Sequence, residues 1–96
     1  MIRREGDRLL IAGPATLANI TGLLDDTLKQ LSNGVTTIDL GEVTELDSSL
    51  LAAALAWLRA ARDAKRPLSF VNLPQGLTTI AGLYGVADPL PVSPRT

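Results

Sequence analysis

Two segments near the start of the chain, residues 1–5 and 8–12, are predicted to form strands, because the polar stretch Glu5-Gly6-Asp7 between them is a hairpin turn signal. Residues 9–11 are Leu-Leu-Ile, an unbroken apolar run that is typical of a strand covered on both faces. We expect Gly13-Pro14 to end the second strand, because proline cannot donate a hydrogen bond to a strand ladder.

Helical spacing of apolar residues then predicts a first helix over residues 16–31, with Leu17, Ile20 and Leu24 at the start of its apolar stripe. The apolar run at 35–40 predicts a buried strand. From the end of that strand onward the chain carries four carboxylates, in a stretch that we expect to form a loop: Asp39, Glu42, Glu45 and Asp47.

A second helix, rich in leucine and alanine, is expected to begin at Ser48 and to end near residue 64. A last strand over 68–71 leads to a third helix, for which Asn72 is the expected N-cap. The apolar stripe predicted for this helix consists of Leu77, Ile80, Ala81 and Tyr84. Its predicted C-terminal cap is Gly85.

The element order β-β-α-β-α-β-α predicts an α/β fold with a mixed sheet, whose parallel strands are joined by right-handed helical crossovers. A chain of 96 residues is expected to form a single domain, 1–96. Residues 87–96 contain three prolines and are expected to form an extended tail.

The composition excludes several kinds of chemistry. The sequence contains no cysteine and no histidine, which removes disulfides, thiol nucleophiles, zinc sites and histidine-based catalysis. It contains no glycine-rich phosphate-binding motif, and its carboxylates match no calcium loop, so we expect no enzymatic activity, metal or cofactor. A formal net charge of -1 without a basic tail argues against nucleic-acid binding. No apolar run is long enough for a membrane span, and the absence of cysteine fits a reducing cytoplasm.

The chemistry that remains centres on Asp47, Ser48 and Ser49, where the second helix begins. Aspartate and serine are typical helix N-caps, so capping is one interpretation. A hydroxyl at a helix N-terminus is also a suitable phosphorylation site, because the positive end of the helix stabilises added negative charge.

The surface of the second helix has two predicted faces. The core stripe is predicted to consist of Leu51, Ala54, Leu55, Leu58 and Ala61. The opposite face is predicted to dock a protein partner and consists of Ala52, Ala53, Ala56, Trp57 and Ala60. Alanine is also an ordinary filler on a helix, which is the alternative interpretation. The cations that end the helix, Arg59, Arg62, Lys65 and Arg66, suit its negative C-terminal end.

These residues resemble the STAS domain family over residues 8–92, most specifically in Ile38-Asp39-Leu40, Val43 and Asp47-Ser48. The stretches 70–72 and 83–88 add a likeness to the MlaB-type subunit of the bacterial phospholipid-transport (Mla) ABC complex. The resemblance implies a four-stranded mixed sheet flanked by three to four helices. It also implies a non-enzymatic, partner-binding role.

In the transport complex the family's subunit binds and supports the ATPase at the cytoplasmic side of the inner membrane, and the complex maintains outer-membrane lipid asymmetry. The resemblance therefore implies an ABC-type ATPase subunit (MlaF-like) as the partner, with Ser48 in the place of a functionally important threonine. The alternative is an anti-sigma factor antagonist that its partner kinase phosphorylates at Ser48. Family members usually have glycine where this chain has Ser49 or Leu50, which favours the transport subunit over the phosphorylation switch.

Overall fold

The computed structural model describes residues 2–83, apart from the side chains of Ala81 and Leu83. The predicted order β-β-α-β-α-β-α is confirmed, and its elements are β1 (Ile2–Glu5), β2 (Arg8–Ala15), α1 (Ile20–Ser32), β3 (Thr37–Leu46), α2 (Ser48–Asp63), β4 (Ser69–Val71) and α3 (Gln75–Leu83). The predicted tail over 87–96 lies outside the described residues, as do Tyr84 and Gly85.

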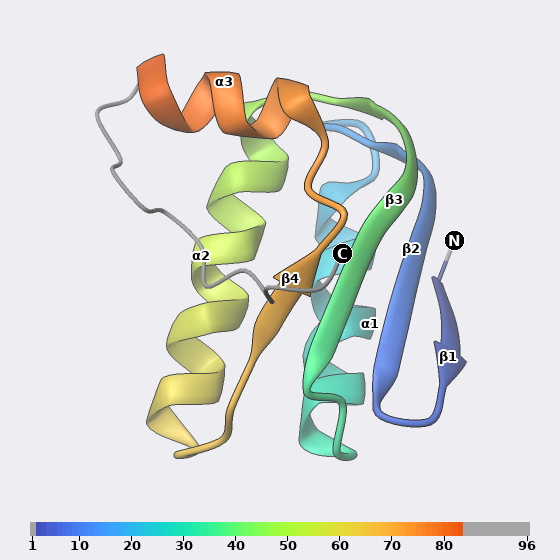
Figure 1. Ribbon diagram of the computed structural model, residues 1–96, viewed down its shortest axis with the longest axis vertical. Coiled ribbons are helices and arrows are strands. Elements are labelled where there is room, and N and C mark those ends of the chain that lie inside the picture. Colours follow the sequence, from blue (N-terminus) through green and yellow to red (C-terminus); the bar gives the residue numbers. More distant parts are fainter. Residues whose placement is uncertain (1, 84–96) are drawn as a thin grey trace.

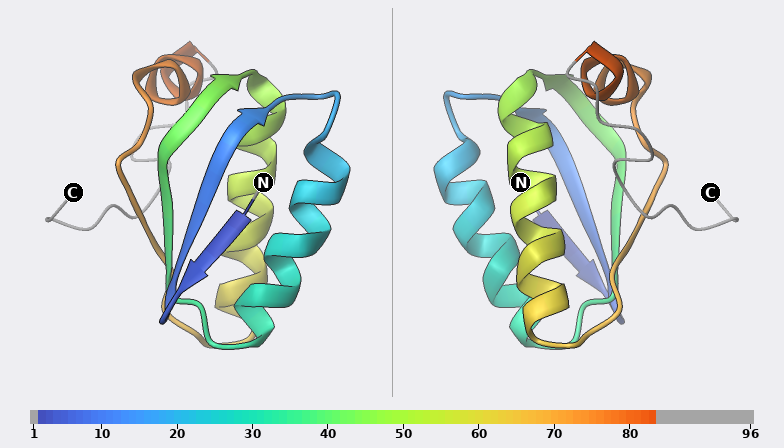
Figure 2. Two further views of the ribbon diagram at one scale, coloured as in Figure 1. Left: turned by 90° about the vertical axis from the view of Figure 1, so that its right-hand side faces the viewer. Right: turned by 90° about the vertical axis from the view of Figure 1, so that its left-hand side faces the viewer.

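The four strands form one mixed sheet in the order β1-β2-β3-β4. β1 pairs antiparallel with β2 through a tight turn at Gly6, while β2, β3 and β4 are parallel. The crossovers β2-α1-β3 and β3-α2-β4 step across the sheet in the same direction. Right-handed connections of this kind place both helices on the same face, as Figures 1 and 2 show. α3 lies across the end of the molecule at which β3 ends and α2 begins (Figure 1).

Both central strands are longer than the sequence predicted. β2 continues through Gly13-Pro14 to Ala15, where the sequence predicted its end. Pro14 lies at a register shift between β2 and β3 and beyond the part of β2 that pairs with β1, and both settings tolerate proline. Asp39, Glu42 and Glu45 lie in β3, where all three pair with β2, so most of the predicted acidic loop is strand and Asp47 follows it.

The first helix begins four residues later than predicted. The Asn19 side chain accepts a hydrogen bond from the backbone N–H of Thr16 at 2.9 Å and donates to the carbonyl of Pro14 at 2.8 Å. These bonds hold residues 14–19 in a turn, so α1 begins only at Ile20. Leu17, predicted to start the apolar stripe, is 77% exposed.

The buried stripe of α2 is rotated from the predicted one. Its buried residues are Leu50, Leu51, Ala53, Ala54, Trp57 and Ala61. Trp57 is fully buried, and its indole N–H donates to the carbonyl of Leu24 in α1 at 3.4 Å. Leu55 and Leu58, predicted in the core, are half-buried against it.

Ala53 and Trp57 were therefore wrongly predicted as parts of a partner-docking face. The prediction followed the leucines and overlooked the size of the indole ring, whose burial removes more apolar surface from water than any other side chain of this helix. Ala53 also faces the interior, one helical turn before Trp57. A small side chain suits this position in a closely packed core.

Adjacent alanines test the orientation of α2. Ala53→Glu should lower the free energy of unfolding by about 3–5 kcal/mol, because it places a carboxylate without a partner in the core. Ala52 is exposed, so Ala52→Glu should change it by less than about 0.5 kcal/mol. Urea denaturation of both variants measures the difference, and equal midpoints would contradict this orientation.

Candidate functional site

Asp47 ties the start of α2 to the segment before α1. Its extended backbone lets one carboxylate oxygen accept from the Ser49 backbone N–H at 2.9 Å and from the Ser49 hydroxyl. The other oxygen accepts from the backbone N–H of Leu17 at 3.0 Å. Asp47 is thus the N-cap of α2, as the capping interpretation predicted, and it also holds the β2–α1 connection in place.

The same bonds keep the Asp47 carboxylate ionised. Hydrogen bonds from the Ser49 hydroxyl and from the Leu17 N–H lower the pKa of Asp47 below its ordinary value, because they stabilise the charged form. A fixed negative charge therefore stands at the positive end of α2, where it is favourable.

Ser48 and Ser49 have different environments. The Ser49 side chain is half-buried and its hydroxyl is bonded to Asp47. Ser48 is exposed at the first position of α2, and its hydroxyl makes no hydrogen bond to any of residues 2–83. Of the two, Ser48 is the hydroxyl accessible to a kinase or a partner surface.

Leu17 is a candidate that the sequence reasoning missed. Among the described residues it is the large hydrophobic side chain that stands exposed, and its backbone N–H is bonded to Asp47. We call Leu17, Asp47, Ser48 and Ala52 the α2 corner. The signal in the sequence was Asn19, a turn-forming residue whose position implies that Leu17 precedes the helix.

The rest of the predicted docking face is only partly available. Ala52 is exposed, and Ala56 and Ala60 are half-buried. Because Ala53 and Trp57 lie in the core, fewer side chains of α2 are available for docking than predicted. The structure thus brings Ser48 and Ala52 together at the α2 corner and leaves Ala60 toward the other end of the helix.

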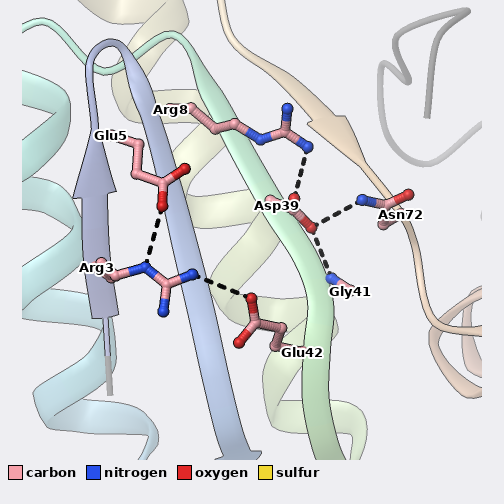
Figure 3. Close-up of polar contacts among 7 residues, drawn as sticks. All are labelled: Arg3, Glu5, Arg8, Asp39, Gly41, Glu42 and Asn72. Carbon is pink, nitrogen blue, oxygen red and sulfur yellow. Dashed lines mark hydrogen bonds and ion pairs between the residues drawn. The ribbon is translucent and has the colours of Figure 1, made fainter.

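A second polar cluster lies on the sheet face away from α1 and α2 (Figure 3). Asp39 is only 7% exposed and accepts bonds from the Arg8 guanidinium at 2.6 Å, the Gly41 N–H at 2.8 Å and the Asn72 amide at 3.1 Å. Arg8 belongs to β2 and Asp39 belongs to β3, while Asn72 directly follows β4. The cluster therefore joins three strands.

Asn72 serves this cluster instead of capping α3. Its φ of 56° is left-handed, which asparagine tolerates better than most residues, and the helix starts later, at Gln75. A Cβ on Gly41 would lie 3.1 Å from both the Asn72 Cβ and the Asp39 Oδ1, so glycine leaves the room that this contact needs.

Hydrogen bonds offset the unfavourable burial of the charge on Asp39. Desolvation raises the pKa of Asp39, but the bonds from Gly41, Asn72 and Arg8 together outweigh it and lower the pKa below its ordinary value. The three hydrogen bonds to Asp39 therefore serve the fold. Among the described residues, no group of acidic side chains could hold a metal ion. We assign this cluster a structural role.

Comparisons with known proteins agree with this geometry. Residues 2–92 match a family model described as "Mlab, STAS domain". The chain belongs to the STAS domain family. A search of curated proteins found no match. Within the described residues, no helix is both long enough and apolar enough to cross a membrane.

Among solved structures, this STAS domain is similar to the anti-sigma factor antagonist SpoIIAA in its unphosphorylated form, with a TM-score of 0.67 and 13% sequence identity. The similarity covers 90% of this chain and 80% of that chain. At this identity the likeness concerns the fold, and it confirms the predicted STAS-type α/β architecture.

Asp47 and Ser48, two of the four residues of the α2 corner, should differ in their effect on stability. Asp47→Ala should cost about 1–2 kcal/mol, since it removes the α2 cap and the bond to Leu17. Ser48→Ala should change stability by less than about 0.5 kcal/mol, because the hydroxyl has no partner among the described residues. Urea midpoints test this, and a larger loss for Ser48→Ala would assign the cap to Ser48.

Acid titration tests the Asp39 cluster. Asp39→Asn should lower the free energy of unfolding at pH 7 by about 1–3 kcal/mol, the value of hydrogen bonds to a charged group. The pKa of Asp39 is lowered by folding, so this contribution is complete above about pH 4 and is lost as the pH falls through the folded-state pKa. The gap between wild type and variant should therefore narrow in acid.

The control is Glu5→Gln, which breaks the ion pair with Arg3, in which both side chains are more than half exposed. It should change stability by less than about 1 kcal/mol at any pH. A gap for Asp39→Asn that stays constant from pH 7 to pH 2 would show that the charge of Asp39 contributes nothing.

Proposed function

We propose that this STAS domain is a non-enzymatic docking subunit that binds and supports the ATPase of an ABC-type phospholipid-transport complex. The observation that carries the proposal is the α2 corner, in which an exposed leucine and a serine hydroxyl without a hydrogen bond to residues 2–83 lie beside the same carboxylate. The description of the matching family model, which names Mlab, supports this choice of complex.

The corner has the properties of a small docking surface. Leu17 at 77% exposure offers an apolar anchor, and Asp47 and Ser48 provide polar groups around it. Exposed apolar groups with a polar rim are typical of protein interaction sites. Ala52 adds a small side chain that lets a partner approach the helix backbone.

A non-enzymatic role agrees with the chemistry of the side chains. The sequence has no histidine or cysteine, and Asp39, a buried carboxylate, accepts hydrogen bonds from Arg8, Gly41 and Asn72. The proposal gives the chain no cofactor, no nucleic acid and no direct insertion into the membrane. It would stay in the cytoplasm, peripheral to the inner membrane through the ATPase, and would support outer-membrane lipid asymmetry.

A second candidate function is that of an anti-sigma factor antagonist, controlled by phosphorylation of Ser48. The observation in its favour is the exposed hydroxyl of Ser48 at the first position of α2, where a phosphate would benefit from the helix dipole. The fold is similar to that of SpoIIAA, which is such an antagonist. Here the partner would be an anti-sigma factor kinase.

Binding measurements with purified partners test the proposal. Leu17→Asp should leave the urea midpoint nearly unchanged, because the side chain is mostly exposed, and should weaken binding to the ATPase by tenfold or more, which corresponds to about 1.4 kcal/mol. Ser48→Asp should also weaken it, since the added charge lies beside Asp47. Glu5→Gln, in the hairpin at the far end of the sheet, is the control and should bind like wild type.

The two functions give different results in this experiment. The transport subunit should bind a purified ABC phospholipid-transporter ATPase and should not be phosphorylated by an anti-sigma factor kinase. An antagonist should become phosphorylated at Ser48 by such a kinase, with Ser48→Ala as the negative control. Wild-type ATPase affinity in both Leu17→Asp and Ser48→Asp would remove the α2 corner from the interface.

A further inference from the structure

A hollow of about 190 Å³ lies between the last turns of α1 and α2, at the end of α2 that is opposite to the α2 corner. One wall comes from Leu28, Leu31 and Val35. The other wall comes from Ala60, Ala61 and Ala64, whose methyl groups are too small to fill the space. The rest of the lining, which we call the rim, comes from Ser32, Arg66 and Pro67, and the lining as a whole is more apolar than polar.

Both helices end here with the same hydrogen-bond pattern. In α2 the N–H of Arg66 donates to the Ala61 carbonyl at 2.9 Å, and the N–H of Lys65 donates to Arg62 at 3.0 Å. In α1 the N–H groups of residues 35 and 34 donate to residues 30 and 31 in the same way. These Schellman motifs turn both chains sharply away from the helix axes.

Arg66 gives the rim a fixed positive charge. One of its guanidinium nitrogens donates to the carbonyls of Leu31 at 2.8 Å and Ser32 at 3.0 Å, the last turn of α1. Because these bonds satisfy carbonyls that the helix leaves open, the position of Arg66 follows from the fold. The guanidinium of this lining residue is therefore held in place against the end of α1.

Lys65 adds a second charge at a conformational cost. It has a φ of 56°, the left-handed conformation that Gly34 adopts at the equivalent position after α1. A residue with a Cβ is disfavoured in this conformation, because the Cβ comes too close to a backbone carbonyl oxygen. Lysine at this position is thus unfavourable for the turn, and the fold alone does not account for it.

The surrounding charges have few partners. Residues 59–66 contain four cations and one carboxylate, in a chain whose formal net charge is -1. Arg62 pairs with Asp63 at 3.7 Å, with both side chains about three-quarters exposed. Arg59 and Lys65 are exposed and make no ion pair with any of the described residues.

We propose that the hollow is a docking site for an acidic segment of a protein partner, which inserts one leucine or phenylalanine side chain between the helices. The volume is well below that of a site for a drug-sized molecule and suits a single side chain. The cations around it complement carboxylates on either side of that anchor. A bilayer surface would use the cations but not the hollow, so a protein segment is the occupant that both features favour.

Peptide selection tests this site, which does not depend on the proposed function at the α2 corner. A library of random twelve-residue peptides displayed on phage is panned against the immobilised full chain, and enriched peptides are synthesised and titrated by fluorescence polarisation. The expected peptides carry leucine or phenylalanine flanked by aspartate or glutamate. Their affinity should fall on the order of tenfold in Ala60→Leu, which fills the hollow.

Lys65→Gly separates binding from folding. It relieves the left-handed lysine, so its urea midpoint should rise, while peptide affinity should fall on the order of tenfold because the charge is lost. Arg3→Gln removes a cation on β1 and should leave the affinity unchanged.

Three outcomes would overturn the site. They are no enrichment, enriched peptides without acidic residues, and wild-type affinity in both Ala60→Leu and Lys65→Gly. Co-sedimentation with vesicles of equal parts phosphatidylglycerol and phosphatidylcholine completes the test. Binding to the vesicles that Lys65→Gly weakens, without selection of acidic peptides, would assign this end of the molecule to a membrane instead.

Discussion

The parallel pairing of β2 with β3 is the constraint on which both polar clusters depend. It runs from Arg8 beside Thr37 to Ala15 beside Leu46, through two register shifts. At its start the pairing brings Arg8 next to Asp39, and at its end it sets Asp47 beside the connection that contains Leu17. Because residues so far apart in sequence meet only through this ladder, a slip in register would disrupt both clusters together.

Local sequence signals were sufficient for the order and kind of the elements. The turn at Gly6, the apolar runs of the strands and the helical periodicity of α2 each follow from short-range chemistry. The ends of β2 and β3 did not follow, because strand length is decided by the partner strand. Pro14 marks the end of a strand in isolation, yet pairing to β3 carries the strand past it.

The candidate site was predictable where one residue type performs a local task, as Asp47 does at the start of α2. It was not predictable where tertiary packing decides. The side of α2 that faces the core depends on the contact between Trp57 and α1, which periodicity alone does not rank above a stripe of leucines. The exposure of Leu17 depends likewise on the bonds of Asn19, which delay the helix.

The two oxygens of Asp47 have one further consequence. One oxygen is bonded to Ser49, next to Ser48, and the other to the backbone of Leu17. A single carboxylate therefore links the start of α2 to the segment that contains Leu17. A charge added at Ser48 that reorients this carboxylate would change the position of Leu17. If modification of Ser48 changes the free energy of ligand binding at Leu17, thermodynamic reciprocity requires that ligand binding at Leu17 change the free energy of modification at Ser48 by the same amount. The α2 corner would thus act as one coupled unit, in which occupancy and modification report on each other.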